Sequence, residues 1–497
     1  MAERPRILQA TTPGTFSRSL LSNITSTPNV SAMSTKNEVE LKNFFIFNSS
    51  LGPKEGEEIK KIVYYFPPTD SNDQQIKNVG LVEGIIQFTE TFKPSSEVSS
   101  LHTLKQRQLY YQPEKDFWIV MTLIVPTVKK NKDSTSTIEY LEDDIQDNVY
   151  SAVLQQAYLM YRLFWDTFHN AFKKDDINVF KTRLDVFYSA YIKTMKLAHS
   201  DILNIFSGIQ YLPLDMQSFL KVQTFINELE CNYNDIVHSA FLYNDHLIWS
   251  GIEPSDMKIA YQYLIGTLLP ANMETELQGG SMPRNSGSPF AALHHGRFIT
   301  GPTNLKTAKT VGKVPKIYLF GGKTPCTYRL AVYRALSASV CLFIKDVELS
   351  LGFFKELDEF MSSKITSIVS DIAEYCSKQV LTPSSLPEST PRFIYFNKLN
   401  LAYKSTVHLD NKQSGNIVCA RDSLKIIADI NKKKGIFGHS GEVIVKTMND
   451  YWVVGKTSNS REFYIAINQK NASLIDISDE VKKICDTELK GIFFHPI

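Results

Sequence analysis

Apolar residues along the chain fall into two kinds of segment: short runs of β-branched and aromatic residues, and longer stretches with apolar positions every three or four residues. The first group opens with two short runs, residues 41–47 and 61–66, which predict a pair of strands. Residues 78–92 follow with helical spacing. The apolar positions that define this spacing are Leu81, Ile85, Phe88 and Phe92. We therefore expect a helix that buries these four side chains against the strands.

Three further short runs and a long helical pattern complete the first group. The short runs are residues 101–111, 117–125 and 136–141. The helical pattern then extends to about residue 172, and Asp143 and Asp144 stand where an N-cap and a first-turn acid favour its start. Its predicted buried positions are Ile145, Val149, Ala152, Val153, Met160, Phe164 and Phe168. The order is strand, strand, helix, three strands, helix.

The same order recurs twice, after a helical stretch at residues 177–230. The second group has strands at 237–243, 246–249, 297–300, 315–320 and within 327–344, a helix that starts at Glu253-Pro254-Ser255, and another at 347–377. The third group has strands at 392–396, 442–447, 451–456 and 462–468, a helix at 421–433, and a last helix marked by Leu474, Ile477, Val481 and Ile484. Because no repeat of residues accompanies this order, the threefold organisation rests on element order alone.

Each group predicts one α+β domain, in which a five-stranded antiparallel sheet carries helices on both faces. This α-β-α arrangement resembles longin and roadblock domains, whose edge strands and first helices are free to pair with another copy. The chain then divides into a disordered tail (1–38), a first longin-like domain with a helical extension (39–230), a second domain (231–380), a linker (381–391) and a third domain (392–497).

Composition narrows the class of protein. The 54 basic residues nearly balance the 52 acidic ones, which argues against nucleic acid as the main partner. No charge-free apolar run reaches the roughly 18 residues of a membrane-spanning helix. The six cysteines are scattered without a Cys-x-x-Cys pair, so neither a disulfide framework nor a zinc site is predicted. We expect a soluble, cytoplasmic protein, although the even cysteine count leaves secretion open.

The first 37 residues are rich in Ser, Thr, Pro and Asn and lack the apolar core of a secretory signal. A mitochondrial transit peptide shares their basic character, but Pro5, Pro13 and Pro28 interrupt the amphipathic helix that it requires. A disordered tail is the simpler interpretation.

Catalytic and ligand-binding motifs are nearly absent. Gly322-Lys323-Thr324 lacks the first glycine of a phosphate-binding loop, because Ile317 stands in that position. His294 and His295 have no third ligand at metal spacing. We therefore predict no covalent catalysis, no bound metal and no cofactor. A catalytic triad assembled from residues distant in the chain is the alternative, which one sequence does not exclude.

Lys129, Lys130 and Lys132 form a basic run between two predicted strands of the first group. On a connecting loop they are expected to contact anionic lipid weakly. The alternative is an ordinary solvated loop. Lys432, Lys433 and Lys434 end a predicted helix, where lysines favour the helix dipole without any ligand.

Several sequence stretches resemble one family through all three groups. They are 44–47 (FFIF), 78–81 (NVGL), 117–121 (FWIVM), 240–251 (AFLYNDHLIWSG), 296–302 (GRFITGP), 393–397 (FIYFN), 404–408 (KSTVH) and 450–456 (DYWVVGK). They are similar to the Ccz subunits of Mon–Ccz complexes, which act in vacuolar and endosomal fusion. The resemblance covers about residues 40–497.

This resemblance implies three longin domains and a heterodimer with a Mon subunit, in which the two first longin domains pair. The family's heterodimer is a guanine nucleotide exchange factor for the late-endosomal Rab GTPase (Rab seven) and drives endosome maturation. A third, scaffold-like subunit joins it in animals. Recruitment to endosome, lysosome or vacuole membranes through anionic and phosphoinositide lipids is implied as well. A subunit that only scaffolds or tethers is the alternative.

We expect the Rab to contact Asn78, at the start of the first helix, and the turn that carries Gln112, Pro113, Phe117 and Trp118. Because Phe117 and Trp118 are neighbours on a strand, they face opposite sides of the sheet, and one of them is expected to be core.

Overall fold

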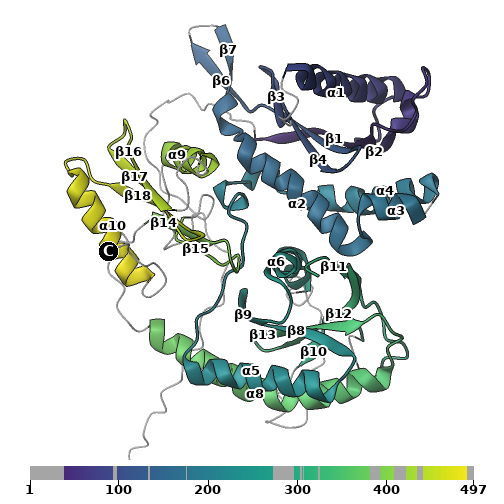
Figure 1. Ribbon diagram of the computed structural model, residues 1–497, viewed down its shortest axis with the longest axis vertical. Coiled ribbons are helices and arrows are strands. Elements are labelled where there is room, and N and C mark those ends of the chain that lie inside the picture. Colours follow the sequence, from purple (N-terminus) through teal and green to yellow (C-terminus); the bar gives the residue numbers. More distant parts are fainter. Residues whose placement is uncertain are drawn as a thin grey trace, which may run out of the picture.

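The computed structural model describes residues 38–92, 98–132, 135–174, 176–272, 296–302, 305, 307–322, 325–380, 392–407, 421–433 and 440–489. The predicted tail (apart from Glu38), the linker, Lys323, Thr324, His294, His295 and Lys434 lie outside these residues. Within them, three α+β units follow one another along the chain (Figure 1).

The first unit is built on a five-stranded antiparallel sheet in the order β2-β1-β5-β4-β3. Its strands are β1 (Glu40–Asn48), β2 (Ile62–Phe66), β3 (Ser100–His102), β4 (Gln106–Glu114) and β5 (Phe117–Ile124). The inner strand β1 faces both cores because its side chains alternate: Phe44 packs on one side of the sheet and Phe45 on the other.

Helices cover both faces of this sheet. The helix α1 (Asn72–Phe92) lies on the face of Phe45. On the opposite face lie α2 (Asp147–Trp165), α3 (Phe168–Lys174) and α4 (Ile177–Thr194), with Phe44 in their core. The predicted α-β-α layering of the first unit is confirmed.

Three local predictions for the first unit are wrong. Residues 101–111 form two strands, β3 and β4, and residues 136–141 lie outside the sheet, in β7 (Thr135–Tyr140), which pairs with β6 (Thr127–Lys132) as a separate hairpin. The long helix starts at Asp147, because residues 142–144 form only a 3-10 turn, η2 (Glu142–Asp144). It ends at Trp165, where Asp166 adopts a φ of 70° that an α-helix cannot continue.

The second unit has six strands, one more than predicted. They are β8 (Ile236–Tyr243), β9 (His246–Ser250), β10 (Arg297–Phe298), β11 (Lys316–Leu319), β12 (Cys326–Ala335) and β13 (Ala338–Lys345). The order is β10-β12-β13-β8-β9, and β11 also pairs with β12. The extra strand arises because the single predicted range 327–344 folds into a hairpin of two strands, β12 and β13.

Helices again lie on both faces of the second sheet. On one face lies α6 (Pro254–Tyr263), with Met257 and Tyr261 in the core. On the other face, α5 (Met216–Asn232) and α8 (Leu351–Val380) pack together. We had placed residues 216–230 in an extension of the first domain; this placement is wrong, because the apolar face of α5 packs into the second core.

The third unit has the same strand order as the first, β15-β14-β18-β17-β16. Its elements are β14 (Arg392–Asn397), β15 (Tyr403–Ser405), α9 (Arg421–Lys432), β16 (Ser440–Lys446), β17 (Tyr451–Ser458), β18 (Arg461–Asn468) and α10 (Leu474–Glu488). The two helices cover opposite faces of the sheet. The prediction of one architecture repeated three times is confirmed.

A short segment between α4 and α5 joins the second and third sheets. Ile209 donates its N–H to the Leu401 carbonyl (2.8 Å) and accepts from the Tyr403 N–H (2.9 Å), beside β15. Three residues later, the Leu212 N–H donates to the Leu247 carbonyl on β9 (3.0 Å). Residues 209–212 therefore cover one edge of each sheet, and these edges are closed to other strands.

Candidate partner-binding surface of the first unit

An apolar stripe runs along the solvent-exposed side of α1, between polar residues such as Lys77 and Gln87. Leu81, Phe88 and Phe92 are 57%, 64% and 74% exposed, and the Phe88 and Phe92 rings pack edge to face with centroids 4.9 Å apart. The residues that α1 buries against the sheet are instead Val79, Val82 and Ile86. The predicted buried stripe of this helix is therefore wrong. Both stripes have helical spacing, and the sheet selects the one with the smaller side chains.

Glycines flatten this exposed face. A Cβ atom at Gly80 or Gly84 would have no atom within 4 Å, so neither glycine is required by packing inside the chain. Glycines four residues apart in a helix let a second helix approach closely. The edge strand β3 lies next to α1, since Leu101 of β3 packs into the core under α1. The outer side of β3 has no strand partner in the described residues.

Asn78 lies in the second turn of α1, not at its start. Its side-chain Nδ2 donates to the Tyr65 hydroxyl (2.6 Å), and its Oδ1 accepts from Gln74 Nε2 (3.1 Å). The Tyr65 hydroxyl in turn donates to Asp70 (2.9 Å), and burial raises the pKa of Tyr65 to about 12. Asn78 is thus half-buried and connects α1 to β2.

The turn between β4 and β5 is rigidly attached to the helices. Glu114 accepts the Phe168 N–H (2.6 Å) and the His169 N–H (2.8 Å), so its carboxylate caps the start of α3. Gln112 and Pro113, just before Glu114 on β4, are partly exposed. Both residues stand at a bulge in the β4–β5 pairing.

Phe117 and Trp118 are both buried, at 1% and 7% exposure. Phe117 packs against Phe168 and Phe180 on the α2 side, and Trp118 belongs to the core under α1. One of the two is expected from the sequence to be core, and the structure makes both of them core because helices cover both faces of the sheet.

The basic run lies on a strand rather than on a loop. Lys129 pairs with Ile138 across the β6–β7 hairpin, and both side chains are exposed. Lys130 and Lys132 pair with Thr137 and Thr135, and the side chains of these two lysines lie outside the described part of the structure.

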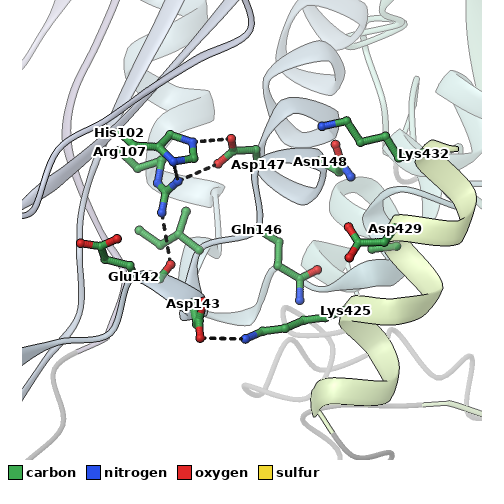
Figure 2. A pocket seen from close by; sticks show the side chains of 12 residues that line it. His102, Arg107, Glu142, Asp143, Gln146, Asp147, Asn148, Lys425, Asp429 and Lys432 are labelled. Carbon is green, nitrogen blue, oxygen red and sulfur yellow. Dashed lines mark hydrogen bonds and ion pairs between the residues drawn. The ribbon is translucent and has the colours of Figure 1, made fainter. Parts of the chain in front are cut away.

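A polar cleft of about 370 Å³ separates the first unit from α9 of the third unit (Figure 2). Its wall on the first unit holds a tight ionic cluster. Asp147, in the first turn of α2, lies 2.6 Å from His102 Nε2 and 3.4 Å from the Arg107 guanidinium, and it accepts the Ser100 hydroxyl (2.6 Å). These contacts fasten β3 and β4 to the start of α2.

This cluster does not form a catalytic triad. Asp147 and Ser100 both approach the same imidazole nitrogen, Nε2 of His102, whereas Nδ1 faces Arg107. In a Ser-His-Asp triad the carboxylate holds one nitrogen and the serine uses the other. The geometry therefore offers no base for a serine nucleophile.

Across the cleft, α9 presents a row of charges. Lys425 lies 3.3 Å from Asp143 of η2, and Asp429 and Lys432 line the same wall (Figure 2). Sequence reasoning missed this cleft, because its two walls are almost 300 residues apart and neither carries a motif. Asp143 itself, predicted to start a helix, joins the first unit to the third.

Other chemistry is sparse in the part of the chain that the structure describes. No group of three or more His, Cys, Asp and Glu there could hold a metal ion. Burial raises the pKa of the Cys341 thiol to about 12 and of Cys485 to about 11, which keeps both protonated at neutral pH. None of the described helices combines the length and apolarity that crossing a bilayer needs.

The three α+β units with longin topology define a tandem longin protein. Family profiles agree with this class. The profile "First Longin domain of INTU, CCZ1 and HPS4" matches residues 41–166, and the Intu longin-like domains 2 and 3 match residues 236–362 and 387–484.

Similar curated proteins identify the family within this class. A Xenopus laevis protein named "Vacuolar fusion protein CCZ1 homolog" is 44% identical over 91% of this chain and 97% of its own length. Proteins of the same name from Nematostella vectensis and Dictyostelium discoideum are 42% and 27% identical, over 91% and 92% of this chain and 98% of each relative. The chain belongs to the CCZ1 family of vacuolar fusion proteins.

Proposed function

We propose that the chain is a subunit of a membrane-trafficking complex, and that it pairs with a Mon-type subunit to form a guanine nucleotide exchange factor for the late-endosomal Rab. The apolar face of α1 carries this proposal. A chain that exposes Leu81, Phe88 and Phe92 on one helix next to a free strand edge has a surface suited to another longin domain.

Nucleotide exchange requires no covalent catalysis. An exchange factor binds the nucleotide-free GTPase more tightly than the loaded form, and by reciprocity the nucleotide and the factor weaken each other's binding. A platform of two paired longin domains can do this by holding the switch region of the GTPase away from the phosphates. The scarcity of catalytic chemistry in the described residues is compatible with such a role.

Asn78, Gln112 and Pro113 remain our proposed Rab contacts from this chain, because all three are partly exposed on the first unit. Phe117 and Trp118 are proposed to support that surface from beneath. Lys129, Lys130 and Lys132 on the β6–β7 hairpin are proposed to contact anionic or phosphoinositide lipid during peripheral recruitment to endosomes, lysosomes or vacuoles. A third scaffold subunit would complete the complex in animals.

The test is the release of a fluorescent guanine nucleotide from the late-endosomal Rab. This chain, the Mon subunit, and both together are added in separate reactions. We expect acceleration only with both subunits. Asn78→Ala is expected to lower the rate of nucleotide release with both subunits present. Lys129→Ala is expected to lower this rate only when the Rab is presented on vesicles with anionic lipid.

A second candidate is a scaffold or tether that takes no part in exchange. The burial of Phe117 and Trp118 favours it, because it removes two large side chains from the predicted Rab surface. Full exchange activity from the Mon subunit alone would establish this role and reject a composite exchange site.

A further inference from the structure

The outer edge of β2 forms the floor of a groove of about 460 Å³. Four consecutive residues of β2, from Ile62 to Tyr65, line it, which means that the groove follows the strand rather than a single side chain. In the described part of the chain β2 pairs only with β1, so no strand covers its other side.

Two walls flank this edge, one on each face of the sheet. Lys181, Thr182 and Asp185 of α4 form one wall, and Pro68, before α1, and Gln75, in its first turn, form the other. Figure 1 shows β2 at the end of the first sheet between these two helices. A strand edge between two walls is the geometry in which an extended peptide adds to a sheet.

The side chains of β2 hold both walls in place. The Tyr64 hydroxyl lies 3.4 Å from the Ser189 hydroxyl on α4, and the Tyr65 hydroxyl accepts from Asn78 of α1 (2.6 Å). Because the two tyrosines point to opposite faces, the groove is held open from both sides. It is therefore preformed, which lowers the entropic cost of binding a segment there.

Lys181 gives the groove its chemical preference. Its side chain is half-buried, and burial lowers the pKa of its ammonium group. No carboxylate among the described residues pairs with it, although Asp185 follows one turn later and accepts the Ser189 hydroxyl instead (3.0 Å). A half-buried ammonium without a counter-ion favours a ligand that brings a carboxylate.

We infer that this groove binds an extended segment of a partner protein, which pairs with β2 as a sixth strand of the first sheet and places an Asp or Glu against Lys181. The site lies at the opposite end of the sheet from β3, so both edges of the first sheet can be occupied at once. It is independent of the proposed exchange activity.

The probe is a phage library of random eight-residue peptides, selected on the full-length chain. We expect selection to enrich extended sequences with one acidic position. A synthetic peptide of the selected sequence should bind about tenfold or more weakly to Lys181→Met, which keeps most of the side-chain stem and removes the charge. Lys193→Glu, on the same helix but away from the groove, should bind it like the wild type.

Hydrogen exchange on the peptide complex locates the site. The amides of residues 62–66 should exchange more slowly when the peptide is bound, because a new strand protects the free edge of β2. Selected peptides that bind Lys181→Met as well as the wild type, that leave these amides unchanged, or that show no acidic position would overturn the inference.

Discussion

Two glycines show how much one Cβ atom can matter. A Cβ at Gly208 would lie 2.6 Å from the Leu401 carbonyl oxygen and 3.1 Å from the Phe396 ring, because the segment that joins the second and third sheets passes close to β15 here. A Cβ at Gly80, on the outer side of α1, would meet nothing within 4 Å. A single sequence does not separate these two situations.

Gly208→Ala should therefore lower the free energy of unfolding by about 1–3 kcal/mol, the usual cost of overpacking. Gly80→Ala should raise the stability of the isolated chain by about 0.5–1 kcal/mol, because alanine is the better residue in an exposed helix interior. Urea denaturation of both variants checks the pair. Shifts of the same sign in the two midpoints would contradict the packing described for these glycines.

At the scale of the element, α1 shows that hydrophobic periodicity does not predict which of two apolar stripes is buried. Its sequence carries two apolar stripes with helical spacing, and the prediction chose Leu81, Ile85, Phe88 and Phe92 from their spacing alone. The sheet buries Val79, Val82 and Ile86. The stripe of Leu81, Phe88 and Phe92 is left exposed, which is why we propose it as the surface for a partner.

The double variant Phe88→Ser, Phe92→Ser should leave the thermal midpoint of the isolated chain nearly unchanged, since exposed substitutions rarely exceed about 0.5 kcal/mol. It should nevertheless weaken association with the Mon subunit, measured by sedimentation of the mixed subunits. Ile86→Ala is the matched control: on the buried stripe it should cost about 2–5 kcal/mol of stability. Unchanged association of the double variant would remove α1 from the interface.

At the scale of the whole molecule, the first and third units are joined by apolar packing as well as by charge. Ile202 and Phe206, from the segment after α4, fill the core beneath α9. The Lys425–Asp143 ion pair also connects the two units, but the Asp143 side chain is 91% exposed. Water and salt screen such a pair, whereas the apolar contacts are dry.

Phe206→Ala is therefore expected to cost about 3–5 kcal/mol and to loosen the third unit. Lys425→Glu should change stability by no more than about 1 kcal/mol. Unfolding midpoints and the radius of gyration from small-angle scattering measure both effects. A larger loss from Lys425→Glu than from Phe206→Ala would show that the polar cleft, not the buried phenylalanine, joins the units.

Much of the architecture follows from local patterns. Strand–turn–strand signals such as residues 237–249 around Asn244 correspond to the hairpin of β8 and β9, because a tight turn and alternating side chains are properties of neighbouring residues. The candidate surface was harder to predict from the sequence. Asn78 and Pro113 are partly exposed, but the burial of Phe117 depends on α3 and α4, some 50 residues further along the chain.

The sequence by itself determined the order of strands and helices, their threefold recurrence and the family, since all three are carried by residues close together in the chain. Only the tertiary structure decided which stripe of α1 is buried, that α5 belongs to the second core, and that His102, Arg107 and Asp147 meet beside Lys425. The physical reason is the same in each case. Periodicity shows that a face is apolar, but which surface covers that face depends on segments that are distant in sequence and meet only in the folded chain.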